Sequence, residues 1–153
     1  MEKKKFDKKQ YLLSKKEIEN LLIAADDARE RAYAPYSLFK VGAAVLAEDG
    51  KIYSGSNVEN SVYGATVCAE RIAIFKAIND GYRSIKAVAI VAKPMAKGRL
   101  TLPCGICRQV LSEFGEHITV ISSNINNSQI EIMKLEEIFP QPFKMKKNQE
   151  SDV

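Results

Sequence analysis

Apolar residues near the start of the chain recur every three or four positions, at Ile18, Leu21, Leu22, Ala25 and Ala28. This spacing predicts a helix over residues 15–33 with one apolar face. Ser14 stands just before the stretch and Glu17 three residues after Ser14, which is the arrangement of a capping box. The first predicted element is therefore an amphipathic helix with a defined start.

Two short apolar runs follow, at residues 41–46 and 51–55, and Asp49-Gly50 stands between them. An Asp-Gly turn between apolar runs predicts a β-hairpin. Further along, helical spacing and β-type apolar runs alternate, and Gly or Pro punctuates the chain. The predicted elements are helices over 68–79 and 104–114, strands over 87–92, 117–122 and 129–133, and a last helical turn over 135–139.

The order of these elements, α-β-β-α-β-α-β-β-α, predicts an α/β fold. A mixed five-stranded sheet with helices on its faces accommodates this order, which gives a three-layer α/β/α arrangement. The chain of 153 residues is the size of one ordinary domain. We assign residues 15–143 to that domain, 1–14 to a lysine-rich N-terminal segment and 144–153 to a polar basic tail.

The net charge of +4 comes from the two ends of the chain. Residues 1–10 hold five lysines against two acids, and residues 144–153 hold three lysines against two acids. The remaining body is neutral, with fifteen basic and fifteen acidic residues. Because lysine-rich ends are typical of solvated segments, we expect no nucleic-acid partner.

The sequence also indicates a cellular compartment for the protein. No apolar run approaches the roughly twenty residues of a membrane span, and no hydrophobic segment follows the basic first residues. We therefore expect no membrane partner and a cytoplasmic location. Three cysteines at metal-like spacing favour a reducing compartment over a disulfide framework.

All three cysteines belong to one pattern: Cys68, followed two residues later by Glu70, and then Cys104 and Cys107 after Pro103. A catalytic zinc keeps three protein ligands and one open position for water, whereas a structural zinc has four. The three thiols fit the open kind, with one Zn²⁺ per chain. Glu70 is not a ligand, so it is available to take protons from activated water.

Charge explains a role for Arg71, the residue after Glu70. Zinc, three thiolates and an ionised carboxylate sum to −2, which is costly in a water-poor pocket. Two helix N-termini, each worth about +0.5, and Arg71 offset that charge. We therefore expect Arg71 to lie behind the metal ligands, with a place on the helix surface as the alternative.

Other interpretations of the cysteines remain open. Cys104 and Cys107 alone resemble a thioredoxin-like redox pair, and His117 could close a structural zinc site. A zinc-stabilised binding module that uses the basic tails on RNA is a further alternative. Arg108 and Gln109, on the second predicted metal helix, are assigned to packing and to the helix surface.

A ligand, any residue, Glu and later Pro-Cys-x-x-Cys is the established signature of zinc-dependent nucleobase deaminases. Over residues 15–143 the chain resembles the cytidine deaminases of the small, all-cysteine, homotetrameric kind. The stretches that carry the resemblance are Ala34-Pro35-Tyr36-Ser37 with Phe39, Val41-Gly42-Ala43-Ala44, Asn57-Val58-Glu59-Asn60, Cys68-Ala69-Glu70-Arg71 and Pro103-Cys104-Gly105-Ile106-Cys107-Arg108-Gln109-Val110.

The resemblance implies hydrolysis of cytidine and 2′-deoxycytidine to the uridine nucleosides and ammonia, in pyrimidine salvage. Zinc-activated water would attack C4 of the base, with Glu70 as proton shuttle. A related deaminase acting on another cytosine compound, such as a nucleoside antibiotic or a nucleotide, is the alternative. The implied substrate contacts are the ribose with Asn57 and Glu59, the base with Phe39 and the backbone of Ala69, and Ser61, Tyr63 and Phe143 across an interface with a neighbouring subunit.

Overall fold

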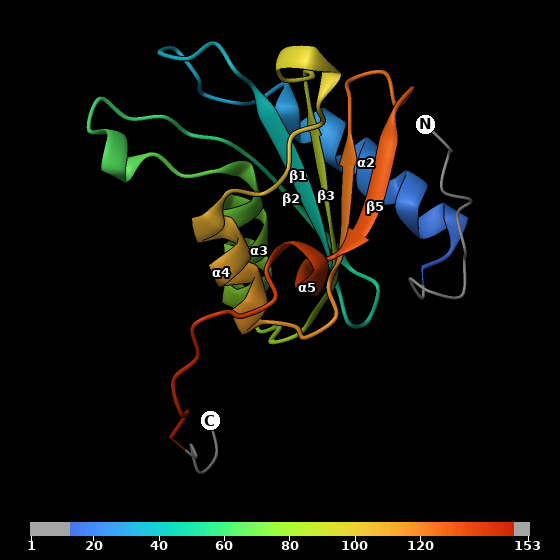
Figure 1. Ribbon diagram of the computed structural model, residues 1–153, viewed down its shortest axis with the longest axis vertical. Coiled ribbons are helices and arrows are strands. Elements are labelled where there is room, and N and C mark those ends of the chain that lie inside the picture. Colours follow the sequence, from blue (N-terminus) through green and yellow to red (C-terminus); the bar gives the residue numbers. More distant parts are fainter. Residues whose placement is uncertain (1–12, 149–153) are drawn as a thin grey trace.

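The computed structural model describes residues 13–148, and a five-stranded sheet with strand order β2-β1-β3-β4-β5 lies at its centre (Figure 1). Strands β3 and β4 pair in parallel and the other neighbours are antiparallel, so the sheet is mixed. The elements are α2 (Lys15–Arg29), β1 (Val41–Ala47), β2 (Ile52–Ser56), α3 (Ala69–Asn79), β3 (Ile85–Ala92), α4 (Gly105–Glu113), β4 (Thr119–Ser123), β5 (Ile130–Lys134), α5 (Leu135–Ile138) and the 3₁₀ turns Tyr63–Ala65 and Ala96–Gly98.

Alternating residues of the central strands supply two separate cores. In β1, Ala44 and Leu46 pack with the apolar face of α2, whereas Val41, Ala43 and Val45 pack with residues of α3, α4 and α5. Successive side chains of a strand point to opposite faces, so a strand covered by helices on both sides is apolar throughout. The predicted three-layer α/β/α fold is therefore confirmed: among the helices of residues 13–148, α2 covers one face, and α3, α4 and α5 lie on the other (Figure 1).

Two glycines set how closely the helices approach the sheet. A Cβ atom at Gly42 would lie 1.8 Å from the carbonyl oxygen of Ala25 in α2. At Gly55 it would lie 2.7 Å from the backbone nitrogen of Ala73 in α3. Both contacts are with backbone, which cannot move aside as a side chain can, so these positions fix both helices on the hairpin.

Three element boundaries differ from the prediction by two residues or more. Helix α2 ends at Arg29 and not at residue 33, because the amide of Tyr33 donates to the carbonyl of Asn57 and the chain has already turned away. Strand β3 begins two residues earlier, at Ile85, and β4 begins at Thr119 and so leaves His117 outside.

Most of the predicted N-terminal segment, residues 1–12, lies outside the described residues, as do residues 149–153 of the predicted tail. Leu13 is 5% exposed and packs with α2 and the sheet, so the core reaches just beyond the helix start. Within residues 13–148, no helix has both the length and the hydrophobicity that crossing a membrane requires.

Candidate functional site

The three cysteines meet where two helices begin. Cys68 is the N-cap of α3, Cys104 is the N-cap of α4, and Cys107 is buried in the first turn of α4. The Sγ atoms of Cys68 and Cys104 are 3.9 Å apart, those of Cys104 and Cys107 are 3.4 Å apart, and all three lie within 4.8 Å of one another. The predicted ligand set is therefore brought together in space.

The cluster fits zinc. A Zn–S bond of about 2.3 Å in a tetrahedral site separates two sulfur atoms by about 3.8 Å, close to the distances found here. Helix N-termini stabilise thiolates, which are the metal-binding form of cysteine. His117 does not supply a fourth ligand, because its side chain is 75% exposed and its Nδ1 lies 3.1 Å from Glu136. Three thiols leave one coordination position open.

The cysteines differ in acidity. The pKa of Cys68 falls to about 5, because Cys107 donates a hydrogen bond to it and because Arg71 stabilises its thiolate. The pKa of Cys107 is raised by that same hydrogen bond and by burial. Arg71 donates to the carbonyl of Thr66 at 3.2 Å and lies 3.8 Å from the Cys68 sulfur. Its guanidinium therefore lies beside the Cys68 sulfur, and its role behind a bound metal stays a prediction.

Glu70 is the second residue of α3 and only 4% of it is exposed. Burial raises the pKa of its carboxyl to about 7, and the Cys68 thiolate adds to the effect. A carboxyl with a pKa near neutrality can both take up and release a proton at physiological pH. Its electrostatic interaction with Cys68 and Cys107 indicates that this carboxyl lies near the cysteine cluster.

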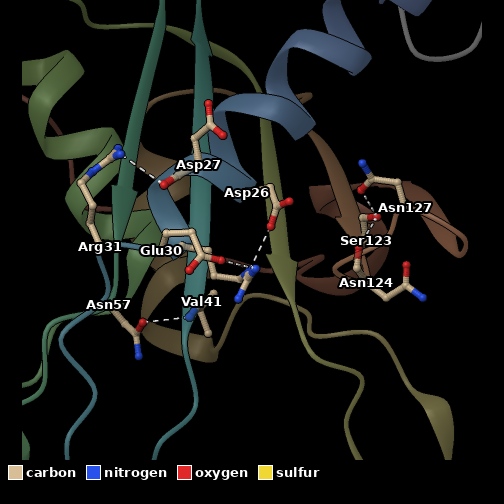
Figure 2. Close-up of polar contacts among 10 residues, drawn as sticks. Asp26, Asp27, Glu30, Arg31, Val41, Asn57, Ser123, Asn124 and Asn127 are labelled. Carbon is tan, nitrogen blue, oxygen red and sulfur yellow. Dashed lines mark hydrogen bonds and ion pairs between the residues drawn. The ribbon is translucent and has the colours of Figure 1, made fainter.

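Asn57 and Glu59 flank Val58, which pairs with the residue before Cys68. The backbone of Val58 exchanges two hydrogen bonds with Val67, at 2.9 and 3.0 Å. Asn57 is buried, and its Oδ1 accepts from the amide of Val41 at 2.9 Å (Figure 2). The Asn57 Nδ2 donates to the carbonyl of Phe39 at 2.8 Å, so one of its two hydrogens is used.

Glu59 is held by the loop that precedes β1. Its Oε1 accepts from the amides of Tyr36 and Ser37, at 3.0 and 3.1 Å. The Ser37 hydroxyl and these amides lower the pKa of Glu59, so the carboxylate stays ionised. The role of the Tyr36 and Ser37 amides was not predicted from the sequence, because a backbone donor carries no signal in residue type.

The other predicted substrate contacts fall into two groups. Phe39 is half-buried and packs against the core on the α3 side of the sheet, and Ala69 is fully buried as the first residue of α3. Ser61 and Tyr63 lie instead in a loop that projects from the body of the molecule (Figure 1), and 84% of Tyr63 is exposed. Phe143 is 70% exposed in the C-terminal segment.

Arg108 and Gln109, predicted from the sequence to serve packing and the helix surface, make contacts that the sequence did not indicate. Both side chains bind the backbone of the C-terminal segment, Arg108 at Ile138 and Gln109 at Phe143. Their position directly after Cys107, on the helix that begins at the cysteine cluster, is the only signal in the sequence that distinguishes them.

The family model for the "Cytidine and deoxycytidylate deaminase zinc-binding region" matches residues 15–123. The chain belongs to the cytidine deaminase family. A cytidine deaminase of Sporosarcina psychrophila is 57% identical over 98 residues, which are 64% of this chain and 70% of the relative. One from Halalkalibacterium halodurans is 43% identical over 123 residues, which are 80% of this chain and 91% of that protein.

Solved cytidine deaminases also share the fold. The crystal structure of the Burkholderia pseudomallei cytidine deaminase matches with a TM-score of 0.75 and 42% identity, over 82% of this chain and 98% of that one. The matched family is described as zinc-binding, in agreement with the three-cysteine cluster of this cytidine deaminase family member.

Proposed function

We propose that this protein is a zinc-dependent cytidine deaminase, which converts cytidine and 2′-deoxycytidine with water to uridine or 2′-deoxyuridine and ammonia. The observation that carries the proposal is the buried Glu70 carboxyl beside the clustered thiols of Cys68, Cys104 and Cys107. We place the reaction in pyrimidine salvage and in a reducing cytoplasm, where the thiols stay available to zinc.

Cys68, Cys104 and Cys107 would hold the metal. Zinc in such a site acts as a Lewis acid and brings the pKa of water near neutrality. Glu70 would accept the first proton that the water loses and deliver it to N3 of the cytosine ring. It would then carry the proton of the new C4 hydroxyl to the amino group, which leaves as ammonia. Its pKa of about 7 suits this exchange in both directions. The Arg71 guanidinium offsets the thiolate charge.

The ribose and the base have separate contacts in this proposal. The ionised Glu59 accepts a hydrogen bond from the 3′-hydroxyl, and the second Nδ2 hydrogen of Asn57 donates to the same edge of the sugar. Phe39 packs on the base. The amide of Ala69, in the first turn of α3 where amides have no helical partner, binds the pyrimidine carbonyl. Because the 3′-hydroxyl is common to both, cytidine and deoxycytidine both fit.

Zinc-loaded protein would first be incubated with cytidine, deoxycytidine, cytosine and cytidine monophosphate, following loss of the cytosine absorbance and release of ammonia. We expect turnover of the two nucleosides, because cytosine lacks the ribose and the Glu59 carboxylate disfavours a phosphate nearby. Turnover of the nucleotide alone would contradict the assignment. Glu70→Gln should lower kcat by about 10²-fold or more while zinc remains bound. An unchanged rate would exclude Glu70 as the proton shuttle, whereas no turnover of any of the four compounds by wild-type protein with zinc bound would point to a non-catalytic zinc module.

We also propose that the active form is a homotetramer whose sites are completed by neighbouring subunits. Tyr63 and Phe143 are 84% and 70% exposed, so both rings are available for contact with a neighbouring subunit. Ser61 lies in the same projecting loop as Tyr63. In hybrid oligomers, a Glu70→Gln subunit would supply its intact Phe143 to the site of a neighbouring Phe143→Ala subunit, which keeps its own Glu70. Mixing the two weak variants should therefore restore activity, and no gain on mixing would contradict shared sites.

A further inference from the structure

The C-terminal strap, residues 139–148, has no helix or strand and extends past α4 from the end of α5 (Figure 1). Arg108 binds two carbonyl groups at once, those of Pro103 and Ile138, each at 2.7 Å. It therefore links the residue before Cys104 to the end of α5. Farther along, Lys147 lies 3.1 Å from Glu113.

The most specific contact is between the Gln109 side chain and the backbone of Phe143. Gln109 Nε2 donates to the Phe143 carbonyl at 2.8 Å, and Oε1 accepts from the Phe143 amide at 3.1 Å. The side-chain amide thus binds both polar groups of one residue, as a neighbouring β-strand would. None of these bonds involves the ring, which stays 70% exposed.

A large ring on a restrained backbone is organised in advance for binding. Contact with a partner then immobilises only the two side-chain torsions of Phe143, because the backbone entropy has already been lost. The restraint comes from α4, the helix that carries Cys104 and Cys107. The strap and the metal centre therefore share one rigid element.

We infer that Gln109 is a positioning residue, which fixes the strap on α4 and thereby presents the Phe143 ring to the nucleoside site of a second copy of this chain. The inference rests on the proposed function for its substrate and for the contact of Phe143 with a neighbouring subunit. It assigns to Gln109 no contact with substrate or metal. Its effect on turnover must therefore pass through Phe143.

Steady-state kinetics on zinc-loaded Gln109→Met, Phe143→Ala and the double variant test this dependence. Methionine keeps the length of glutamine and removes both hydrogen bonds. We expect Gln109→Met to raise KM for cytidine about tenfold with little change in kcat, since two hydrogen bonds are lost. The double variant should be no worse than Phe143→Ala. Additive effects, or loss of kcat and zinc in Gln109→Met, would overturn the inference.

A matched control is Glu113→Gln, which breaks the other side-chain contact between α4 and the strap. This ion pair is partly exposed, so KM should be unchanged. Hydrogen exchange of the strap amides supplies a readout that needs no turnover. Exchange at Phe143 should quicken in Gln109→Met and not in Glu113→Gln, even if cytidine proves not to be the substrate. Equal exchange rates at Phe143 in Gln109→Met and wild type would refute the idea that Gln109 restrains the strap.

Discussion

Replacing Glu70 by Gln should stabilise the metal-free protein at neutral pH, although it is expected to abolish activity. The carboxyl is 4% exposed, and burial raises its pKa from 4.5 to about 7. Each pKa unit corresponds to about 1.4 kcal/mol, so ionising Glu70 lowers the free energy of unfolding by about 3 kcal/mol. Glutamine has nearly the same shape and does not ionise.

The direction in which stability changes with pH follows from the raised pKa of Glu70. The stability associated with the protonated carboxyl is fully present below pH 4.5 and is lost as the pH rises through the folded pKa of about 7. Wild type and Glu70→Gln should therefore differ little near pH 4.5. By pH 8 the variant should be more stable by about 3 kcal/mol.

Urea unfolding of metal-free, thiol-reduced protein between pH 4.5 and pH 8 measures this difference. Glu48→Gln is a suitable control because Glu48 is exposed and lies away from the cluster, in the turn between β1 and β2. Its stability should follow that of wild type at every pH. A stability difference between Glu70→Gln and wild type that does not change with pH would refute the argument.

Three further outcomes follow from the metal cluster and the packing. Cys104→Ser should lose the bound zinc, measured by metal analysis after desalting, and retention of one zinc per chain would exclude Cys104 as a ligand. Because the Cys107 pKa is raised, zinc binding must displace a proton, and zinc affinity in chelator competition should rise between pH 6 and pH 8. Gly42→Ala should lower the free energy of unfolding by about 2 kcal/mol or more in urea titrations. Gly64→Ala, which meets nothing within 4 Å, should have almost no effect.

The sequence predicted the elements whose signals are local. The Asp49-Gly50 turn gave the hairpin, and Ser14 with Glu17 gave the helix start, where both capping-box hydrogen bonds are present. The end of α2 was wrong because it depends on Asn57, which is distant in sequence. Strand order could not be derived, since no local pattern sets which strands become neighbours.

The candidate site likewise contains one feature that the sequence predicts and one that it does not. The spacing of Cys68, Cys104 and Cys107 predicted a cluster that the structure does bring together. The two hydrogen bonds between the Gln109 side chain and the Phe143 backbone join residues 34 positions apart. Such a contact leaves no pattern in a single sequence, so only the three-dimensional structure could reveal it.

The hydrogen bonds from the Asn57 side chain to the segment between Phe39 and Val41 have a consequence for protein engineering. The Asn57 side chain binds only the backbone carbonyl of Phe39 and the backbone amide of Val41. These hydrogen bonds therefore do not depend on which side chains occupy positions 39 and 41. Libraries that vary position 39, the proposed contact with the base, can therefore be searched for altered base preference while these backbone hydrogen bonds are kept. Variation at Glu59 would instead release the Tyr36–Ser37 amides and change shape and selectivity together.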